Sequence, residues 1–170
     1  MAADTTPSPD YERLAAELTG RDAAALVVVG DRRDADLAYC AGGAQPARQS
    51  AVVLTREETL LCVPEPIASR ASETFPGDGV RTFDADRRHP AQAAADALDD
   101  AGAEGEVLTP ATIGHDAALY LERAGYDVAS TDAVAQARER KSDAELARIE
   151  RAQEIAAAGI GRARTVLAEG

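Results

Sequence analysis

The side chains that most often act as nucleophiles or metal ligands are few in this chain and lie far apart. Its two histidines, His89 and His115, each stand near the start of a predicted helix, where a capping or surface role is expected. No His-x-x-x-His, Cys-x-x-Cys or Gly-x-Ser-x-Gly pattern occurs, so neither a zinc site nor a serine-hydrolase site is indicated. We therefore predict no catalytic residue and no metal ligand in this chain.

Three other patterns also have simpler explanations than a functional site. The run 31–36 lacks the glycine and the distal glutamate of a calcium-binding loop, so a solvated acidic turn is expected. Gly159 and Gly161 stand in a helical pattern without the third glycine of a dinucleotide-binding loop. Cys40 and Cys62 lie in apolar segments; a disulfide is conceivable, but buried free thiols in a cytoplasmic protein are favoured.

A helix-start signal near the C-terminus is more informative. Ser142 and Glu145 have the spacing of a capping box, in which each side chain bonds to a backbone N–H near the other residue. Apolar residues follow in steps of three and four, which predicts a helix of roughly 25 residues within 139–170, longer than the usual 8–20. The stripe consists of Leu146, Ile149, Ala152, Ala156, Ile160, Ala163 and Leu167.

The start of this helix resembles the interdomain linker of the creatinase/prolidase/aminopeptidase P family. That linker reads approximately R-x-x-K-S-x-x-E-[IL]-x-x-[IL]-x-x-A. A weaker resemblance extends upstream to about Tyr11 and includes the run 24–29 and the turn that follows it. There Tyr39 and Gly42 match the family's N-x-x-Y-L-T-G-F turn, while Cys40, Ala41 and Gly43 depart from it. The linker positions are filled by Arg138, Lys141, Ser142, Glu145, Leu146, Ile149 and Ala152.

This resemblance implies an N-terminal α/β domain over 11–138, after a disordered tail at 1–10, and a linker helix over 139–170. The helix would lead to a "pita-bread" catalytic domain that this sequence does not contain, so we expect a part of a longer Xaa-Pro dipeptidase or aminopeptidase. In the family, two Asp, one His and two Glu of that domain hold two divalent ions (Mn, Co or Zn), which activate water to attack the Xaa-Pro bond. The chain alone is expected to be inactive and to bind no cofactor.

Family dimers also suggest a role for the loop 42–50. There the N-terminal domain covers the partner's active-site mouth and restricts it to short peptides, so we expect a homodimer. Tyr39 and Arg48 are the candidates to contact a peptide carboxylate or side chain, Arg48 by a bidentate contact. The alternative is that Tyr39 belongs to the core and Arg48 is a surface charge.

The composition excludes some partners. The chain has 170 residues, one lysine (Lys141) and a net charge of −12, which argues against binding to nucleic acid or to an anionic membrane surface. The polar start of the chain predicts no signal peptide. Adaptation to molar salt explains the acidic excess better than the Ala- and Arg-rich bias of a high-GC genome.

Apolar runs and turn residues predict a mixed sheet of five to six strands with helices on its faces. The predicted strands are 23–29, 50–54, 59–63, 80–83, 106–108 and 126–129, of which 50–54 and 59–63 form a hairpin. Residues 30–36 are predicted as a charged turn. The predicted helices are 10–18, 67–75, 89–101, 114–124 and the turn 133–138.

The sequence leaves two rival functions open. The chain could be a stand-alone α/β ligand-binding or regulatory module, or the N-terminal domain of a creatinase-like hydrolase, because one fold serves several chemistries. An open reading frame that continues past Gly170 into a catalytic domain would favour the peptidase.

Overall fold

The structure is a computed structural model that describes residues 9–44, 46, 48–141 and 143–169. The chain forms two units, one that spans Ser8–Glu139 and one that contains the C-terminal segment from Arg140. The division falls within the segment that matches the family linker.

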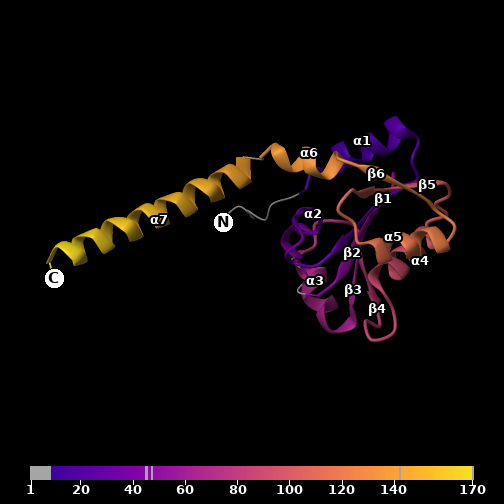
Figure 1. Ribbon diagram of the computed structural model, residues 1–170, viewed down its shortest axis with the longest axis horizontal. Helices are drawn as coiled ribbons and strands as arrows, with labels where there is room; N and C mark the ends of the chain where they lie inside the picture. Colours follow the sequence, from indigo (N-terminus) through magenta and orange to yellow (C-terminus); the bar gives the residue numbers. More distant parts are fainter. Residues whose placement is uncertain (1–8, 45, 47, 142, 170) are drawn as a thin grey trace. The chain divides into compact units, whose positions relative to one another are not determined.

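A six-stranded sheet forms the centre of the first unit, in the order β4-β3-β2-β1-β5-β6 (Figure 1). Strand β2 pairs antiparallel with both of its neighbours, and the other adjacent pairs are parallel. Five strands therefore run in one direction and β2 in the other, as the predicted mixed sheet requires. The strands are β1 (Ala25–Gly30), β2 (Ser50–Leu54), β3 (Thr59–Pro64), β4 (Gly79–Phe83), β5 (Glu106–Pro110) and β6 (Asp127–Thr131).

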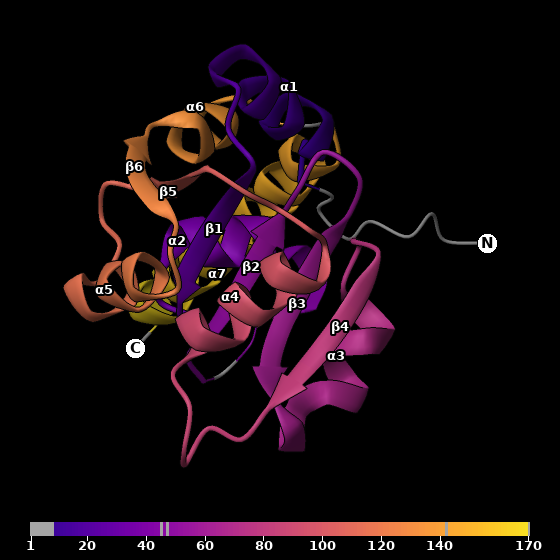
Figure 2. The same cartoon turned by 90° about the vertical axis from the view of Figure 1, so that its right-hand side faces the viewer.

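Helices cover both faces of the sheet. Buried residues of α1, α2, α3 and α6 belong to one core cluster, and those of α4 and α5 to a second cluster on the opposite face (Figure 2). Short 3-10 turns, η1 (Gly42–Ala44) and η2 (Glu65–Ile67), join some of the elements. The helices are α1 (Tyr11–Arg21), α2 (Ala35–Cys40), α3 (Ala68–Thr74), α4 (Pro90–Asp100), α5 (His115–Arg123) and α6 (Ala133–Glu139).

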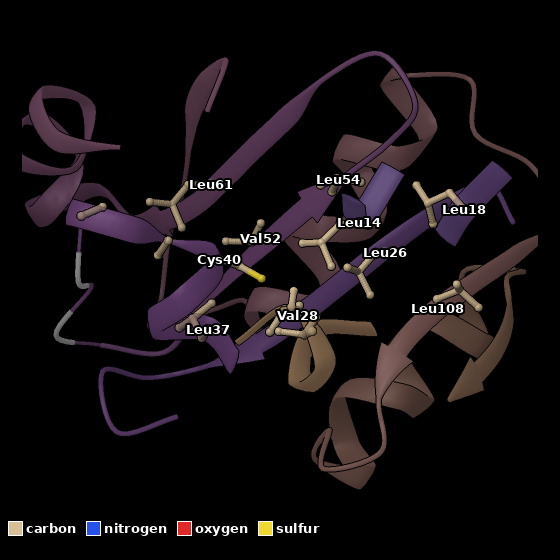
Figure 3. Close-up of a cluster of buried hydrophobic side chains, with 14 of the residues drawn as sticks. Leu14, Leu18, Leu26, Val28, Leu37, Cys40, Val52, Leu54, Leu61 and Leu108 are labelled. Atoms are coloured by element: carbon tan, nitrogen blue, oxygen red, sulfur yellow. The ribbon is translucent and has the colours of Figure 1, made fainter. Parts of the chain in front are cut away.

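The central strand β1 shows why both faces must be covered. Successive side chains of a strand point to opposite faces, so Leu26 and Val28 belong to the first cluster and Val27 to the second. All three are at most 2% exposed. Figure 3 shows the first cluster, where Leu14 of α1 and Leu37 of α2 lie over Leu26 and Val28.

The structure confirms the hairpin and corrects the segment before it. The antiparallel register Ala51↔Cys62 to Leu54↔Thr59 is that of the predicted hairpin. However, 30–36 is not wholly a charged turn, because helix α2 begins at Ala35. The Asp34 carboxylate accepts hydrogen bonds from the N–H groups of Asp36 and Leu37 and so caps this helix. The acidic residues that suggested a solvated turn therefore include a helix cap.

The second unit contains α7 (Asp143–Glu169), a helix of 27 residues. This confirms the long C-terminal helix, and both Gly159 and Gly161 lie inside it. Ser142, the predicted N-cap, lies outside the described residues, so the capping box stays a prediction. Exposed large apolar side chains on α7 are Leu146, Ile149, Ile155, Ile160, Val166 and Leu167.

Candidate functional site

The direction of the strands defines one edge of the sheet as the natural place for a ligand. Strands β1, β3, β4, β5 and β6 all end at this edge, and β2 begins there. In open α/β sheets, ligands bind in crevices outside the carboxyl ends of the strands. The residues that follow β3 and β4 and those that precede β2 therefore meet at this edge.

A cavity of about 460 Å³ lies at this edge. Its apolar side is formed by Pro64 at the end of β3, Phe83 at the end of β4 and Pro90 at the start of α4, all of which are buried. Arg48 lines it from the segment before β2. The other lining residues are Gln49, Ala85, Asp86, Arg87, Arg88 and His89.

His89 is held in the wall of this cavity by contacts with four residues. Its Nδ1 accepts a hydrogen bond from the N–H of Ala91 at 3.2 Å, while Gln92 Oε1 accepts from the N–H of His89 at 2.8 Å. This reciprocal pair is a capping box at the start of α4. The imidazole also stacks on Tyr120 of α5, with ring centroids 5.0 Å apart, and its Nε2 lies 3.3 Å from Asp116 Oδ2. His89 therefore joins α4 to α5, which confirms the capping role predicted for it.

The guanidinium groups at the cavity differ in how far they are neutralised. Arg88 Nη1 lies 2.6 Å from Asp96 Oδ2, and Arg87 Nε lies 3.6 Å from Asp84 Oδ2. None of the ion pairs formed within the described part of the chain involves Arg48, which is exposed. Arg48 is thus the cation at this cavity that is best placed to bind an external anion.

The two predicted substrate-access residues do not meet at one site. Arg48 lines the cavity, whereas Tyr39 is not among the described residues that line it. Tyr39 lies on α2, packs against the first core cluster, and its hydroxyl accepts a hydrogen bond from the N–H of Asp10 at 2.9 Å. These contacts agree with the alternative interpretation of Tyr39 as a core residue; a contact of either residue with substrate stays a prediction.

The sequence drew attention to His89 only as a capping or surface residue, and not to its neighbours Arg87 and Arg88. They lie in the loop between strand β4, which ends at Phe83, and Pro90, the first residue of α4. Cationic side chains between a strand end and a helix start were therefore a readable signal. The sequence alone does not show that Arg48 lies near Arg87 and Arg88. The sheet order places β4 two strands from β2, and this brings Arg48 to the same cavity.

Arg138 of the linker motif forms an ion pair within the first unit. Arg138 Nη1 lies 2.8 Å from Asp36 Oδ1, which ties α6 to α2. The Asp36 side chain is 13% exposed and that of Arg138 is 39% exposed, so the carboxylate is the better shielded partner. Lys141 is exposed and Glu145 is half-buried. Arg138 therefore has a structural role in the first unit, because its ion pair joins α6 to α2.

The two thiols are poor nucleophiles. Cys40 and Cys62 are free, buried and on opposite faces of the sheet, in the first and second core clusters. Burial raises the pKa of both thiols above the ordinary value of 9.0, that of Cys62 to about 12. Because the thiolate is the reactive form, neither cysteine is suited to catalysis. The predicted buried free thiols are confirmed.

The described residues lack two further features. Among them, no three His, Cys, Asp or Glu side chains gather closely enough to hold a metal ion. No helix of the described part is both long and apolar enough to cross a membrane. The expectation that the metal ligands of the parent enzyme belong to another domain stays a prediction.

Solved structures that resemble this one are Xaa-Pro peptidases. The prolidase from Pyrococcus horikoshii superposes with a TM-score of 0.69 at 20% identity, over 86% of this chain and 39% of the prolidase. The Xaa-Pro dipeptidase from Bacillus anthracis gives 0.67 at 14% identity, over 80% of this chain and 37% of that chain. This chain thus spans less than half of these two enzymes.

One of the similar structures is an isolated N-terminal domain, and the match covers nearly all of it. The creatinase/prolidase N-terminal domain of an X-Pro dipeptidase from Streptococcus pyogenes gives a TM-score of 0.58 at 13% identity, over 74% of this chain and 95% of that domain. No model of a known protein family and no curated protein matches the sequence. The chain therefore has the fold of a creatinase/prolidase N-terminal domain, as its linker pattern predicted.

Proposed function

We propose that this chain is the non-catalytic N-terminal domain of a metal-dependent Xaa-Pro dipeptidase or aminopeptidase. The observation that carries the proposal is the agreement of two independent features. The sequence matches the family's linker pattern at seven positions, and the structure matches the N-terminal parts of such enzymes over 74–86% of the chain. A stand-alone module would have no need of the linker pattern.

The role that we propose is to shape the dimer and to limit access of substrate to the catalytic domain. In a homodimer, the edge that bears Arg48 would lie near the active-site mouth of the partner. The Arg48 guanidinium would then bind the carboxylate of a short proline-containing peptide by a charge-assisted, bidentate contact. Its exposure and its freedom from ion pairs among the described residues support this assignment.

We further propose that α7 packs on the catalytic domain of the same chain. Its exposed large apolar residues include Leu146, Ile149 and Ile160, which belong to the predicted stripe. An amphipathic helix buries such a stripe in its folded protein. The two divalent metal ions (Mn, Co or Zn) would belong to that domain, and no residue of this chain is assigned to them.

A cytoplasmic location completes the proposal. Cys40 and Cys62 are both free thiols, which suits a reducing compartment. The net charge of −12 supports the absence of nucleic acid and of anionic membrane surfaces among the partners.

The test compares this chain with the longer protein that contains it. Hydrolysis of Ala-Pro and of longer Xaa-Pro peptides is measured with Mn²⁺, Co²⁺ or Zn²⁺, and again after chelation. The chain alone should show no turnover, and the longer protein should show metal-dependent cleavage. In the longer protein, Arg48→Gln should raise KM for Ala-Pro by about tenfold or more, the effect of losing one charge-assisted contact, while Arg123→Gln on α5 should leave KM unchanged.

Two results would contradict the proposal. Metal-dependent turnover that copurifies with the chain alone would show that the catalytic groups are present here. A longer protein that hydrolyses creatine, or that cleaves no Xaa-Pro bond under any metal, would assign this domain to a different enzyme or to a regulatory module.

A further inference from the structure

Helix α7 carries a seam of residues with the spacing of a coiled coil. Its 27 residues form one continuous helix (Figure 1), and the seam residues follow each other in alternating steps of three and four. A strict seven-residue repeat of this kind keeps one narrow face turned toward another helix. In heptad notation, the a positions of the seam are Leu146, Gln153, Ile160 and Leu167, and the d positions are Ile149, Ala156 and Ala163.

The large apolar side chains of this seam are open to solvent. Leu146, Ile149, Ile160 and Leu167 are all exposed, and an exposed apolar patch that runs along a whole helix marks an interaction surface. Gln153 is the one polar residue of the seam, and a single polar residue at an a position is a known way to fix the register of a coiled coil. The spacing therefore indicates that a helix is the partner of α7.

The charges beside the seam decide in which direction a second copy of α7 can lie. Positions e and g flank the seam, and their charges set the orientation of the partner helix. The e flank of α7 bears Glu150 and Arg164, and the g flank bears Glu145 as its one charged residue. In a parallel pair the g flank of one helix faces the e flank of the other, so Glu145 would meet Glu150 of the second copy, and this repulsion would occur twice.

An antiparallel pair removes the repulsion and replaces it by attraction. Two antiparallel copies are related by a two-fold axis across the helices, so the same flank faces itself. Glu150 of each copy then lies opposite Arg164 of the other. Neither side chain takes part in an ion pair within the part of the chain that the structure describes, so both are available for this contact.

We propose that two copies of this chain associate through an antiparallel pair of α7 helices, with the seam at their interface. The inference goes beyond the proposed function, in which a catalytic domain covers the same apolar stripe. The second copy and the catalytic domain exclude each other, because both need one face of α7. The pair therefore forms in this chain by itself and gives way to the catalytic domain in the longer protein.

Two isoleucines of α7 provide a matched test of the seam. Ile155 is 61% exposed and Ile160 is 64% exposed, but Ile155 occupies heptad position c, away from the seam. Sedimentation equilibrium of the whole chain over a wide range of concentrations measures the Kd of the dimer. Ile160→Ser should raise this Kd by about a hundredfold or more, because both copies lose a buried apolar side chain, while Ile155→Ser should leave it unchanged.

Charge reversal tests the orientation at low ionic strength. Glu150→Arg and Arg164→Glu should each raise the Kd about tenfold, because each turns two attractive contacts into repulsive ones. The double variant restores the opposite charges and should recover the parent Kd. In a parallel pair, by contrast, the new arginine at position 150 would face Glu145 and tighten the dimer. These residues lie in the second unit, so the melting temperature of the first unit should stay constant.

Three results would overturn the inference. A chain that stays monomeric at every concentration would show that α7 does not pair with itself. Equal losses in Ile155→Ser and Ile160→Ser would indicate unspecific association through exposed apolar residues. A tighter dimer in Glu150→Arg, or no recovery in the double variant, would exclude the antiparallel arrangement. None of these results bears on Xaa-Pro cleavage by the longer protein, which tests the proposed function separately.

Discussion

Replacing His89 by alanine should destabilise the Ser8–Glu139 unit by about 2 kcal/mol. The side chain caps α4 through Ala91 and stacks on Tyr120. Loss of a cap costs about 1 kcal/mol, and loss of an aromatic pair costs about 0.5–1.5 kcal/mol. The contact with Asp116 is left out of this sum, because that carboxylate is 68% exposed and exposed ion pairs contribute little.

Urea denaturation followed by circular dichroism measures this loss, with a second variant to separate its parts. His89→Asn keeps a side-chain acceptor at the N-cap but removes the stacked ring, so it should lose only the stacking contribution, about 1 kcal/mol. In thermal melts, the alanine variant should unfold about 4–8 °C lower than the parent chain, at about 2–4 °C for each kcal/mol.

A double-mutant cycle isolates the stacked pair. His89→Ala and Tyr120→Leu should show a coupling of about 0.5–1.5 kcal/mol, while His89→Ala and Tyr126→Phe should be additive, since Tyr126 donates its hydrogen bond to Asp99 instead. The reasoning fails if the asparagine variant loses as much stability as the alanine variant, or if His89 and Tyr120 show no coupling.

Three further predictions concern other parts of the molecule. Arg138→Gln should lower the free energy of unfolding by about 1.5–3 kcal/mol in urea titrations, because it leaves the Asp36 carboxylate without its charged donor at 2.8 Å. Cys40 and Cys62 should react with a thiol reagent such as DTNB only after unfolding. Their raised pKa values stabilise the fold below pH 9.0, and for Cys62 this contribution should fall as pH rises from 9.0 toward about 12. The melting temperature should be higher in 2 M than in 0.1 M KCl, because salt screens the self-repulsion of a net charge of −12.

Each of these three has a contradicting result. Equal stability of Arg138→Gln and the exposed-site control Arg140→Gln would show that the pair with Asp36 contributes nothing. Rapid modification of a thiol in the folded chain would contradict the burial of Cys40 or Cys62. Equal melting temperatures at the two salt concentrations would favour genome composition as the cause of the acidic excess.

The sequence alone predicted the features that depend on local chemistry. Apolar runs bounded by turn residues predicted the strands 50–54 and 59–63, and the structure has Ser50–Leu54 and Thr59–Pro64. Such agreement is expected, because alternation and turn chemistry act over a few residues. Helix α2 was not predicted, because its local sequence signal is ambiguous. Asp34 can act in an acidic turn or as a helix cap, and only the burial of Leu37 and Cys40 against the sheet selects the helix.

Long-range features required the tertiary structure. The strand order β4-β3-β2-β1-β5-β6 depends on which apolar faces pack together, and no local pattern encodes it. That order brings Arg48 to the same cavity as Phe83 and Arg87. Tyr39, which the sequence had grouped with Arg48, packs instead against the first core cluster. The linker pattern thus determined the kind of domain, whereas sheet pairing and burial, which act between residues distant in the chain, decided where a ligand can bind.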